Sequence, residues 1–337
     1  MKVHPYPKKK QPTNFETSQR EFNHELKRLR EIKKFGPLLD RAACQSALTK
    51  FRGKVAYVKS NNLNQLDIWD LETHSLLYCF EGAHQDKIYS MTVTSKHNLL
   101  LSGSADTSIA VWDFEQKKLF HRFNDAHTDI VTFIVTSSEK KLLAASTSLD
   151  RSIAFWDLSK KKLENRIDSA HTTDIHALAM TTDGEFLVSS GDEIIAVWDI
   201  STKKIHHRFL NAHSSSIYCL AVTPDNKYIA SGSADGTIKV WNLRSKALVK
   251  EVTNYNSAEV WSITASVKTP NQLIIGSEDG SISTWVISAD SEDPPKRYSH
   301  NESERPICWL FSSPIIEDNT IVSVCIDAKI IAWDLES

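Results

Sequence analysis

The sequence predicts an all-β protein built from repeated hairpins, and three observations support this fold class. The run Ile229–Arg244 follows a pattern of two β-rich stretches, Lys227–Ser231 and Thr237–Trp241, joined by a Ser-Ala-Asp-Gly turn. An aspartate stands six residues before a tryptophan at Asp106/Trp112, Asp150/Trp156, Asp192/Trp198, Asp235/Trp241, Asp279/Trp285 and Asp327/Trp333. Counting Trp69, the tryptophans follow one another at intervals of 43, 44, 42, 43, 44 and 48 residues. A hairpin that recurs at this period indicates a repeat array that makes up most of the chain.

Charge and composition narrow the class of protein. Residues 1–50 carry twelve Lys and Arg against five Asp and Glu, whereas the rest of the 337-residue chain carries 28 against 37. This asymmetry predicts a basic arm and a mildly acidic body that meet different partners. No apolar run approaches the ~18 residues of a membrane span, and the N-terminus has no hydrophobic core for a secretory signal. We therefore expect a cytoplasmic or nuclear protein that has no membrane partner and keeps its five scattered cysteines reduced.

Residues 1–37 are predicted to form the basic N-terminal arm, with an amphipathic helix over about residues 19–35. Ser18 and Glu21 form a capping box at its start, and Gly36-Pro37 is typical of a helix end. Its narrow apolar stripe contains Phe22, Leu26 and Leu29. An isolated helix of this length is marginally stable, so the stripe must pack on the folded body or on a partner helix in a coiled coil. The sequence leaves these two alternatives open.

The repeated unit resembles a WD repeat. Its parts are an Ala-His step, a Ser-Gly-Ser-x-Asp turn and a strand ending in Val-Trp-Asp or Val-Trp-Asn, and the resemblance covers roughly residues 50–337. It implies a β-propeller over residues 38–337, with four-stranded antiparallel blades around a central channel. The tryptophan-terminated units imply seven blades. It also implies that a segment within Lys33–Phe51 supplies the outermost strand of the last blade.

The resemblance further implies four hydrogen-bonded sets, each of a histidine, a serine, the turn aspartate and the tryptophan. The sets are His84/Ser102/Asp106/Trp112, His127/Ser146/Asp150/Trp156, His171/Ser189/Asp192/Trp198 and His213/Ser231/Asp235/Trp241. A Ser, His and Asp combination is also found in hydrolases. Copies at a fixed interval, each tied to a tryptophan, favour a structural role, because a fully satisfied buried polar chain fixes one arrangement.

Strand alternation predicts where a partner could bind. If the branched residues Ile88, Val131, Ile175, Ile217 and Val260 face the blade cores, the residues that follow them face the channel mouth. The residue before each turn aspartate joins the same rim in propellers. The predicted partner-binding rim consists of Tyr89, Leu149, His176, Tyr218, Trp261, Trp309 and Ile326. Aromatic residues of this kind often anchor interfaces.

No catalytic pattern remains once the repeated residues are assigned. The sequence has no phosphate-binding Gly-rich loop and no metal-spaced Cys/His cluster. We therefore expect a non-enzymatic protein–protein interaction scaffold, a subunit or adaptor of a larger complex, with no cofactor, metal or small-molecule substrate. Nucleic acid could bind only through the basic arm.

Two alternatives come from the family resemblance. One is a substrate receptor of a cullin-RING ubiquitin ligase, because the run that ends at Arg244 resembles an adaptor-docking box with Arg244 as the charged contact. The other is a G-protein-β-like signalling subunit, a family that also places a helix before its repeats.

Overall fold

The structure is a computed structural model that describes residues 46–334 except 52–53, 61–63, 71–72, 74, 95–96, 138–141, 192, 254–256, 267–268, 270, 288–294, 299–306, 312–319 and 326–329. The basic arm, the predicted helix over about 19–35 and its possible coiled coil lie outside these residues. Within the described part, no helix is long and apolar enough to cross a membrane.

The described chain is all-β, as predicted, and each sheet is built from strands that are consecutive in the sequence. The first three sheets contain β1 (Ser46–Phe51), β2 (Lys54–Ser60), β3 (Leu66–Asp70) and β4 (Leu76–Phe80); β5 (Ile88–Val93), β6 (Leu99–Ser104), β7 (Ile109–Asp113) and β8 (Lys118–Phe123); and β9 (Val131–Thr136), β10 (Leu143–Ser148), β11 (Ile153–Asp157) and β12 (Lys162–Ile167). The next two contain β13 (Ile175–Met180), β14 (Phe186–Gly191), β15 (Ile194–Asp199) and β16 (Lys204–Phe209); and β17 (Ile217–Val222), β18 (Tyr228–Ser233), β19 (Thr237–Asn242) and β20 (Leu248–Thr253). The last described sheets contain β21 (Val260–Ala265), β22 (Gln272–Ser277), β23 (Ile282–Val286) and β24 (Lys296–Tyr298); and β25 (Ile307–Phe311), β26 (Thr320–Cys325) and β27 (Ile330–Asp334).

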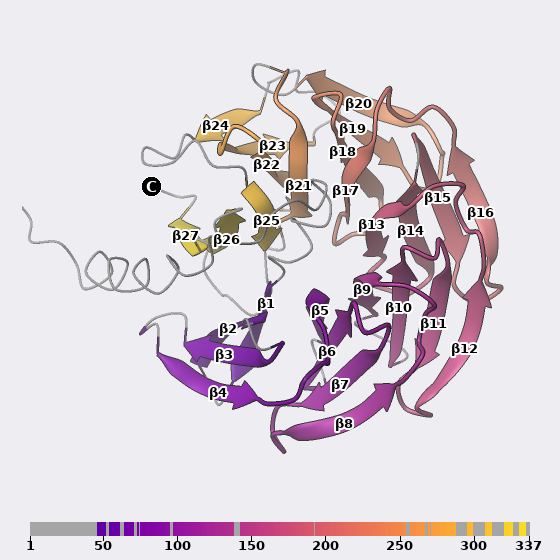
Figure 1. Cartoon of the computed structure of the whole chain (residues 1–337). Helices are drawn as coiled ribbons and strands as arrows, with labels where there is room; N and C mark the ends of the chain where they lie inside the picture. The colour runs from indigo at the N-terminus through magenta and orange to yellow at the C-terminus, as the bar shows by residue number, and fades with distance from the viewer. Residues whose placement is uncertain are drawn as a thin grey trace, which may run out of the picture.

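The sheets stand side by side around a common centre (Figure 1). The first strand of each sheet lies nearest the centre and contacts the first strand of the next sheet, as β5 does with β9 and β9 with β13. The fourth strands β8, β12, β16 and β20 lie at the outer edge. The strand pairs of the described residues are antiparallel, which confirms the predicted four-stranded antiparallel blades.

The segment expected to close the last blade is described only in part. Of the range Lys33–Phe51, residues 46–51 form β1, which pairs with β2 in the first sheet, and the remainder lies outside the described residues. The closing strand therefore stays a prediction.

The hydrophobic cores lie between neighbouring sheets. One core joins Val58, Leu66 and Phe80 of the first sheet to Ile88, Leu100 and Trp112 of the second. The repeat tryptophan packs against the last aromatic residue of the preceding sheet, with ring centroids 4.9 Å apart for Phe80–Trp112, 4.6 Å for Phe123–Trp156 and 4.8 Å for Phe209–Trp241. Each sheet therefore buries apolar surface mainly against its two neighbours, as repeat proteins do.

Glycine is required where two sheets approach most closely. A Cβ atom built on Gly232 of β18 would lie 2.3 Å from Val260 Cγ1 and 2.7 Å from Cys219 Sγ. Val260 belongs to β21, so a side chain at position 232 would push the neighbouring sheet away.

Replacing Gly232 with Val is expected to lower the free energy of unfolding by about 1–3 kcal/mol, because the added atoms overpack the junction between these sheets. Urea unfolding of the whole chain measures this change. Ala247→Val is the control, because Ala247 is exposed in the turn between β19 and β20, and there the change should stay within about 0.5 kcal/mol. Equal urea midpoints for Gly232→Val and the wild type would contradict the assigned close approach.

Candidate functional site

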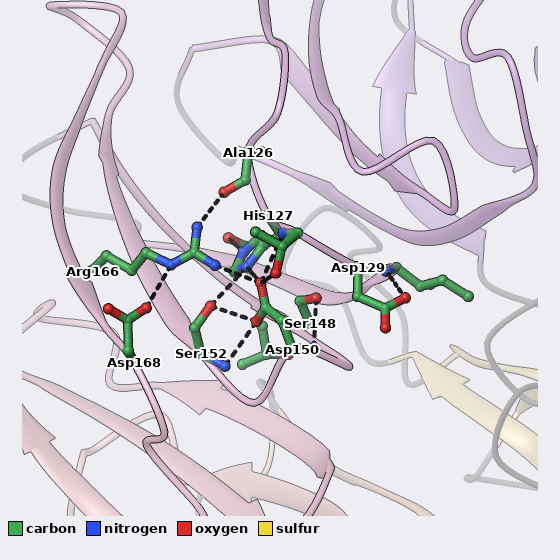
Figure 2. A network of polar contacts seen from close by, with 12 residues as sticks. Ala126, His127, Asp129, Ser148, Asp150, Ser152, Arg166 and Asp168 are labelled. Atoms are coloured by element: carbon green, nitrogen blue, oxygen red, sulfur yellow. Dashed lines mark hydrogen bonds and ion pairs between the residues drawn. The ribbon is translucent and has the colours of Figure 1, made fainter.

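A hydrogen-bonded network crosses the β9–β12 sheet (Figure 2). His127 stands in the loop before β9, and its Nδ1 lies 3.2 Å from Asp150 Oδ2 in the β10–β11 turn. Its Nε2 lies 2.7 Å from Ser146 Oγ, and Trp156 Nε1–H donates to the same oxygen at 2.8 Å. One loop and two strands are thus joined through a single serine hydroxyl.

The protonation of the network follows from its donors and acceptors. The Asp150 carboxylate only accepts, so His127 Nδ1 carries the proton and Nε2 accepts from the Ser146 hydroxyl. Burial lowers the pKa of His127 below 6.5, even though Asp150 acts in the opposite direction, which keeps the ring neutral. The pKa of Asp150 lies well below its ordinary value, because hydrogen bonds from His127, Ser152 and the Thr128 amide outweigh the effect of burial.

The same contacts occur in two other sets of the predicted list. His84 Nε2 lies 2.8 Å from Ser102 Oγ and its Nδ1 lies 3.0 Å from Asp106 Oδ2, and Trp112 Nε1 donates to Ser102 at 3.2 Å. In the third set, the corresponding distances are 2.8 Å for His213–Ser231, 3.1 Å for His213–Asp235 and 3.1 Å for Trp241–Ser231.

The remaining predicted set differs in its turn. Ser189 Oγ lies 2.8 Å from His171 Nε2 and accepts from Trp198 Nε1 at 2.8 Å, while Asp192 lies outside the described residues. The chain is one residue shorter between Ser189 and Asp192 than between the serine and aspartate of the other sets. Gly191 fills part of this turn, and a Cβ there would lie 2.7 Å from the His171 ring.

Sequence reasoning missed an arginine that extends the network from the fourth strand. Arg166 of β12 forms an ion pair with Asp150 Oδ2 at 2.5 Å and donates to the carbonyl of Ala126 at 3.3 Å (Figure 2). Arg122 and Arg208 donate to the corresponding carbonyls of Ala83 and Ala170, and Arg297 pairs with Asp279 at 2.9 Å. A usable signal was present, because Arg122, Arg166 and Arg208 each stand ten residues after a repeat tryptophan.

In the β17–β20 sheet a glutamate stands at the position of this arginine, and it pairs with a lysine of the third strand. Glu251 occupies the arginine position of β20 and lies opposite Lys239, as Arg166 lies opposite Ala154 in the β9–β12 sheet. Lys239 Nζ is 3.5 Å from Glu251 Oε1.

The geometry of these sets suits support of the fold rather than attack on a substrate. Ser102, Ser146, Ser189 and Ser231 are each 0% exposed. In each set the serine oxygen already accepts from an indole and its hydroxyl is held at a histidine. A nucleophile must reach the reacting atom, and these hydroxyls are enclosed.

The rim positions share a backbone feature that alternation did not predict. In the innermost strands, the register with the second strand skips one residue, which forms a β-bulge. The skipped residues are Tyr89, Thr132, His176, Tyr218, Trp261 and Cys308. A bulge re-aims a side chain relative to strict alternation.

The structure corrects the exposure expected for two rim aromatics. Tyr89 is 3% exposed and Trp261 is 8% exposed, so neither ring is open to a partner. The Trp261 indole donates to Glu259 Oε2 at 2.9 Å, which ties it to its own loop.

Other rim residues keep part of their surface. Leu149, His176 and Tyr218 are half-buried. Leu149 and His176 line a shallow hollow of about 460 Å³ together with Arg151, Thr173 and Asp174. Trp309 pairs with Val324 at the position after the bulge, and its side chain and Ile326 lie outside the described residues. Their place on the rim stays a prediction.

Arg244 lies away from the rim, in the turn between β19 and β20. Its side chain is exposed and its amide donates to Asn242 Oδ1 at 3.0 Å. The adaptor contact of a ubiquitin ligase stays a prediction at this residue.

Comparison with known families identifies the repeat. Residues 74–113, 117–157, 163–199 and 204–242 match the family described as WD domain, G-beta repeat. The chain is a WD-repeat protein. Each matched WD repeat starts close to or within the outermost strand of one sheet and ends with the third strand of the next sheet. The WD repeat is thus offset by one strand from the sheet, which links neighbouring sheets covalently.

Curated relatives share parts of this WD-repeat region. The chain is 28% identical over 96 residues to nucleoporin Nup43 of Homo sapiens, which covers 28% of this chain and 25% of the relative. It is 28% identical over 85 residues to nucleoporin Nup43 of Mus musculus, covering 25% and 22%. Protein SPA1-RELATED 3 of Arabidopsis thaliana is 37% identical over 60 residues, covering 18% and 7%. The matches thus span a quarter or less of each of these relatives.

Stability is expected to fall as the pH drops below 6.5, because burial lowers the pKa values of His127 and His213 below that ordinary value. The unfolded chain then binds protons that the folded network does not, so the contribution is complete above pH 6.5 and decreases below it. Asp235 adds a second decrease at lower pH: burial raises its pKa, but hydrogen bonds from Thr237 and the Ser214 amide lower it to about 2.

The urea midpoint of the whole chain, followed from pH 7.5 to pH 5 at constant ionic strength, measures this dependence. His213→Gln removes one of the histidines whose pKa is lowered in the folded chain and should make the decline below pH 6.5 shallower. A decline of the same size in wild type and variant would contradict the assignment to this histidine.

Proposed function

We propose that the chain is a non-enzymatic scaffold, a subunit that holds other proteins together in a larger assembly. In this proposal residues 38–337 close into a seven-bladed propeller, and the basic arm of residues 1–37 forms a second attachment point. The WD repeats support the scaffold, and the partial match to two nucleoporins supports membership of a multi-subunit complex at the nucleus.

The observation that carries the proposal is the hollow lined by Leu149, Arg151, Thr173, Asp174 and His176. The hollow lies where two sheets meet, since Leu149 and Arg151 come from the β10–β11 turn and Thr173, Asp174 and His176 come from the loop before β13 and its first residues. Apolar, cationic, anionic and aromatic side chains thus line one concave surface. Such a mixture suits a protein segment, which offers both main-chain groups and apolar side chains.

The hydrogen-bonded set of the β9–β12 sheet fixes the turn that carries part of this surface. His127 and Asp150 hold the loop before β9 against the turn that carries Leu149 and Arg151. The hollow is therefore preorganised, and a segment that binds there costs less free energy of ordering than one that binds a mobile loop.

Replacing Leu149, His176 and Tyr218 together with Ala is expected to reduce partner capture at least about tenfold, because half-buried anchors carry most of the binding energy of an interface. The measurement is affinity capture from native extract with the whole chain as bait, quantified by mass spectrometry. Trp261 is left intact, since it is buried and its loss would disturb the fold.

The matched control is Leu210→Ala with Val286→Ala, which removes two exposed apolar side chains, 66% and 49% exposed, that do not line the hollow. Thermal unfolding of each variant confirms that the fold is intact. If the triple variant captures the same proteins in the same amounts as the control, the rim is not the binding surface.

A further inference from the structure

The outermost strands expose aliphatic side chains at one repeated position. Within the described chain the exposed large hydrophobic residues are Leu76, Leu119, Leu163, Ile205, Leu210, Leu248, Val249 and Val286. Five of them, Leu76, Leu119, Leu163, Ile205 and Leu248, are the strand partners of Trp69, Trp112, Trp156, Trp198 and Trp241. They recur once in each of five successive sheets, at the same strand position of the repeat.

This position lies at the end of the sheets opposite the hollow described above. Strand β11 runs from Ile153, next to the Asp150 turn, to Asp157, and Leu163 follows the turn at that far end. Leu119, Ile205 and Leu248 occupy the same place in their sheets, at the start of β8, β16 and β20. The surface is therefore separate from the rim.

Lysines surround the exposed aliphatic residues. Lys118, Lys162 and Lys204 directly precede Leu119, Leu163 and Ile205, and all three lysines are exposed. The turns before these strands also place a lysine in the left-handed region. These are Lys117, Lys161, Lys203 and Lys246, with φ angles of 53°, 54°, 57° and 60°. Glycine or asparagine adopts this conformation at lower cost. Backbone strain of this kind is often retained where a side chain has a function.

Side-chain contacts join neighbouring sheets along this surface. Lys161 Nζ lies 4.2 Å from the centre of the Phe120 ring and donates to the Phe120 carbonyl at 3.2 Å. Lys203 Nζ pairs with Glu164 at 3.0 Å. Phe120 follows Leu119, and Glu164 follows Leu163, so the surface continues from one sheet to the next. We call the exposed residues Leu119, Leu163, Ile205 and Leu248, with Lys118, Lys162 and Lys204, the lysine–aliphatic belt.

The carboxylates near the belt are already engaged. Asp113, Asp157 and Asp199 accept amide hydrogen bonds within their own turns. Glu115 accepts from Asn98 at 2.8 Å, and Glu164 is paired with Lys203. Among the described residues, Lys118, Lys162 and Lys204 form no ion pair, so their ammonium groups are available to a carboxylate of a partner.

We infer that the lysine–aliphatic belt is a docking surface for an acidic amphipathic helix of another protein. Apolar side chains of the helix contact the aliphatic residues, and its Glu or Asp side chains pair with Lys118, Lys162 and Lys204. Charge complementarity selects an acidic segment, and the recurrence of the aliphatic residues selects one with a repeated apolar face.

Two other occupants are considered. Strand addition is disfavoured, because a bulge follows each exposed aliphatic residue, with Phe120, Glu164 and His206 as the skipped residues. A membrane is the remaining alternative, and the vesicle experiment below distinguishes it from the helix.

The test uses a fluorescent designed helix of about 20 residues, long enough to be helical in part, with Leu on one face and Glu elsewhere. Fluorescence anisotropy measures its binding to the whole chain. Two variants are compared with the wild type: Leu119→Ser, Leu163→Ser and Ile205→Ser together, and Lys118→Glu, Lys162→Glu and Lys204→Glu together. We expect each to weaken binding at least about tenfold, and we expect added salt to weaken wild-type binding.

The matched control variant is Leu210→Ser, which removes an exposed apolar side chain in the loop before β17, away from the belt, and should bind the helix as the wild type does. Thermal unfolding shows that each variant is folded. The rim variant of Leu149, His176 and Tyr218 should also bind as the wild type does, which separates this surface from the proposed function.

Three results would overturn the inference. One is the absence of saturable binding of the acidic helix to the wild type. Another is equal binding of a helix in which Lys replaces every Glu. The third is belt-dependent binding to phosphatidylserine vesicles that the acidic helix does not displace, which would assign the surface to a membrane.

Discussion

The serine hydroxyl buried in each of the four hydrogen-bonded sets is the interaction on which the rest of the structure depends. In the β9–β12 sheet it gives its proton to His127 and receives one from Trp156, while His127 gives its own to Asp150. A loop, two strands and a turn thus meet in one bonded chain, and Arg166 adds the fourth strand. An unsatisfied buried polar group costs about 1–3 kcal/mol, so any displacement of the loop is opposed by several such costs together. The tryptophan that ends the chain of bonds also packs on the neighbouring sheet, through Phe123.

Periodicity in the sequence predicted the parts of the molecule that repeat. The six-residue interval between Asp150 and Trp156 places the two ends of one hydrogen-bonded set, and the strands of the repeats fall where the alternating residues indicated. The histidine loops followed from the same spacing. These features could be read from the sequence because every copy satisfies the same local requirements, so that one copy explains the others.

Features that depend on one added or one missing residue could not be predicted in this way. Strict alternation directs Tyr89 and Trp261 to the channel, but each is the extra residue of a bulge and is buried. The shorter turn after Ser189 likewise changes one set without changing its Asp-to-Trp interval. Arg166 was missed for another reason: an arginine on an edge strand is usually solvated, and only the register opposite Ala154 shows that it turns back to Asp150.

Each hydrogen-bonded set closes within a single sheet, and this has a consequence for how such a chain can change over generations. A duplicated or deleted WD repeat carries the histidine, serine, aspartate and tryptophan of one set together with the arginine of the preceding set, so the neighbouring sheets still join one of each and no polar group is stranded in the interior. The polar bonding therefore sets no limit on the number of copies. What limits it is the shape of the junctions, such as the close approach of Val260 to Gly232, because each junction fixes the angle at which the next sheet can stand.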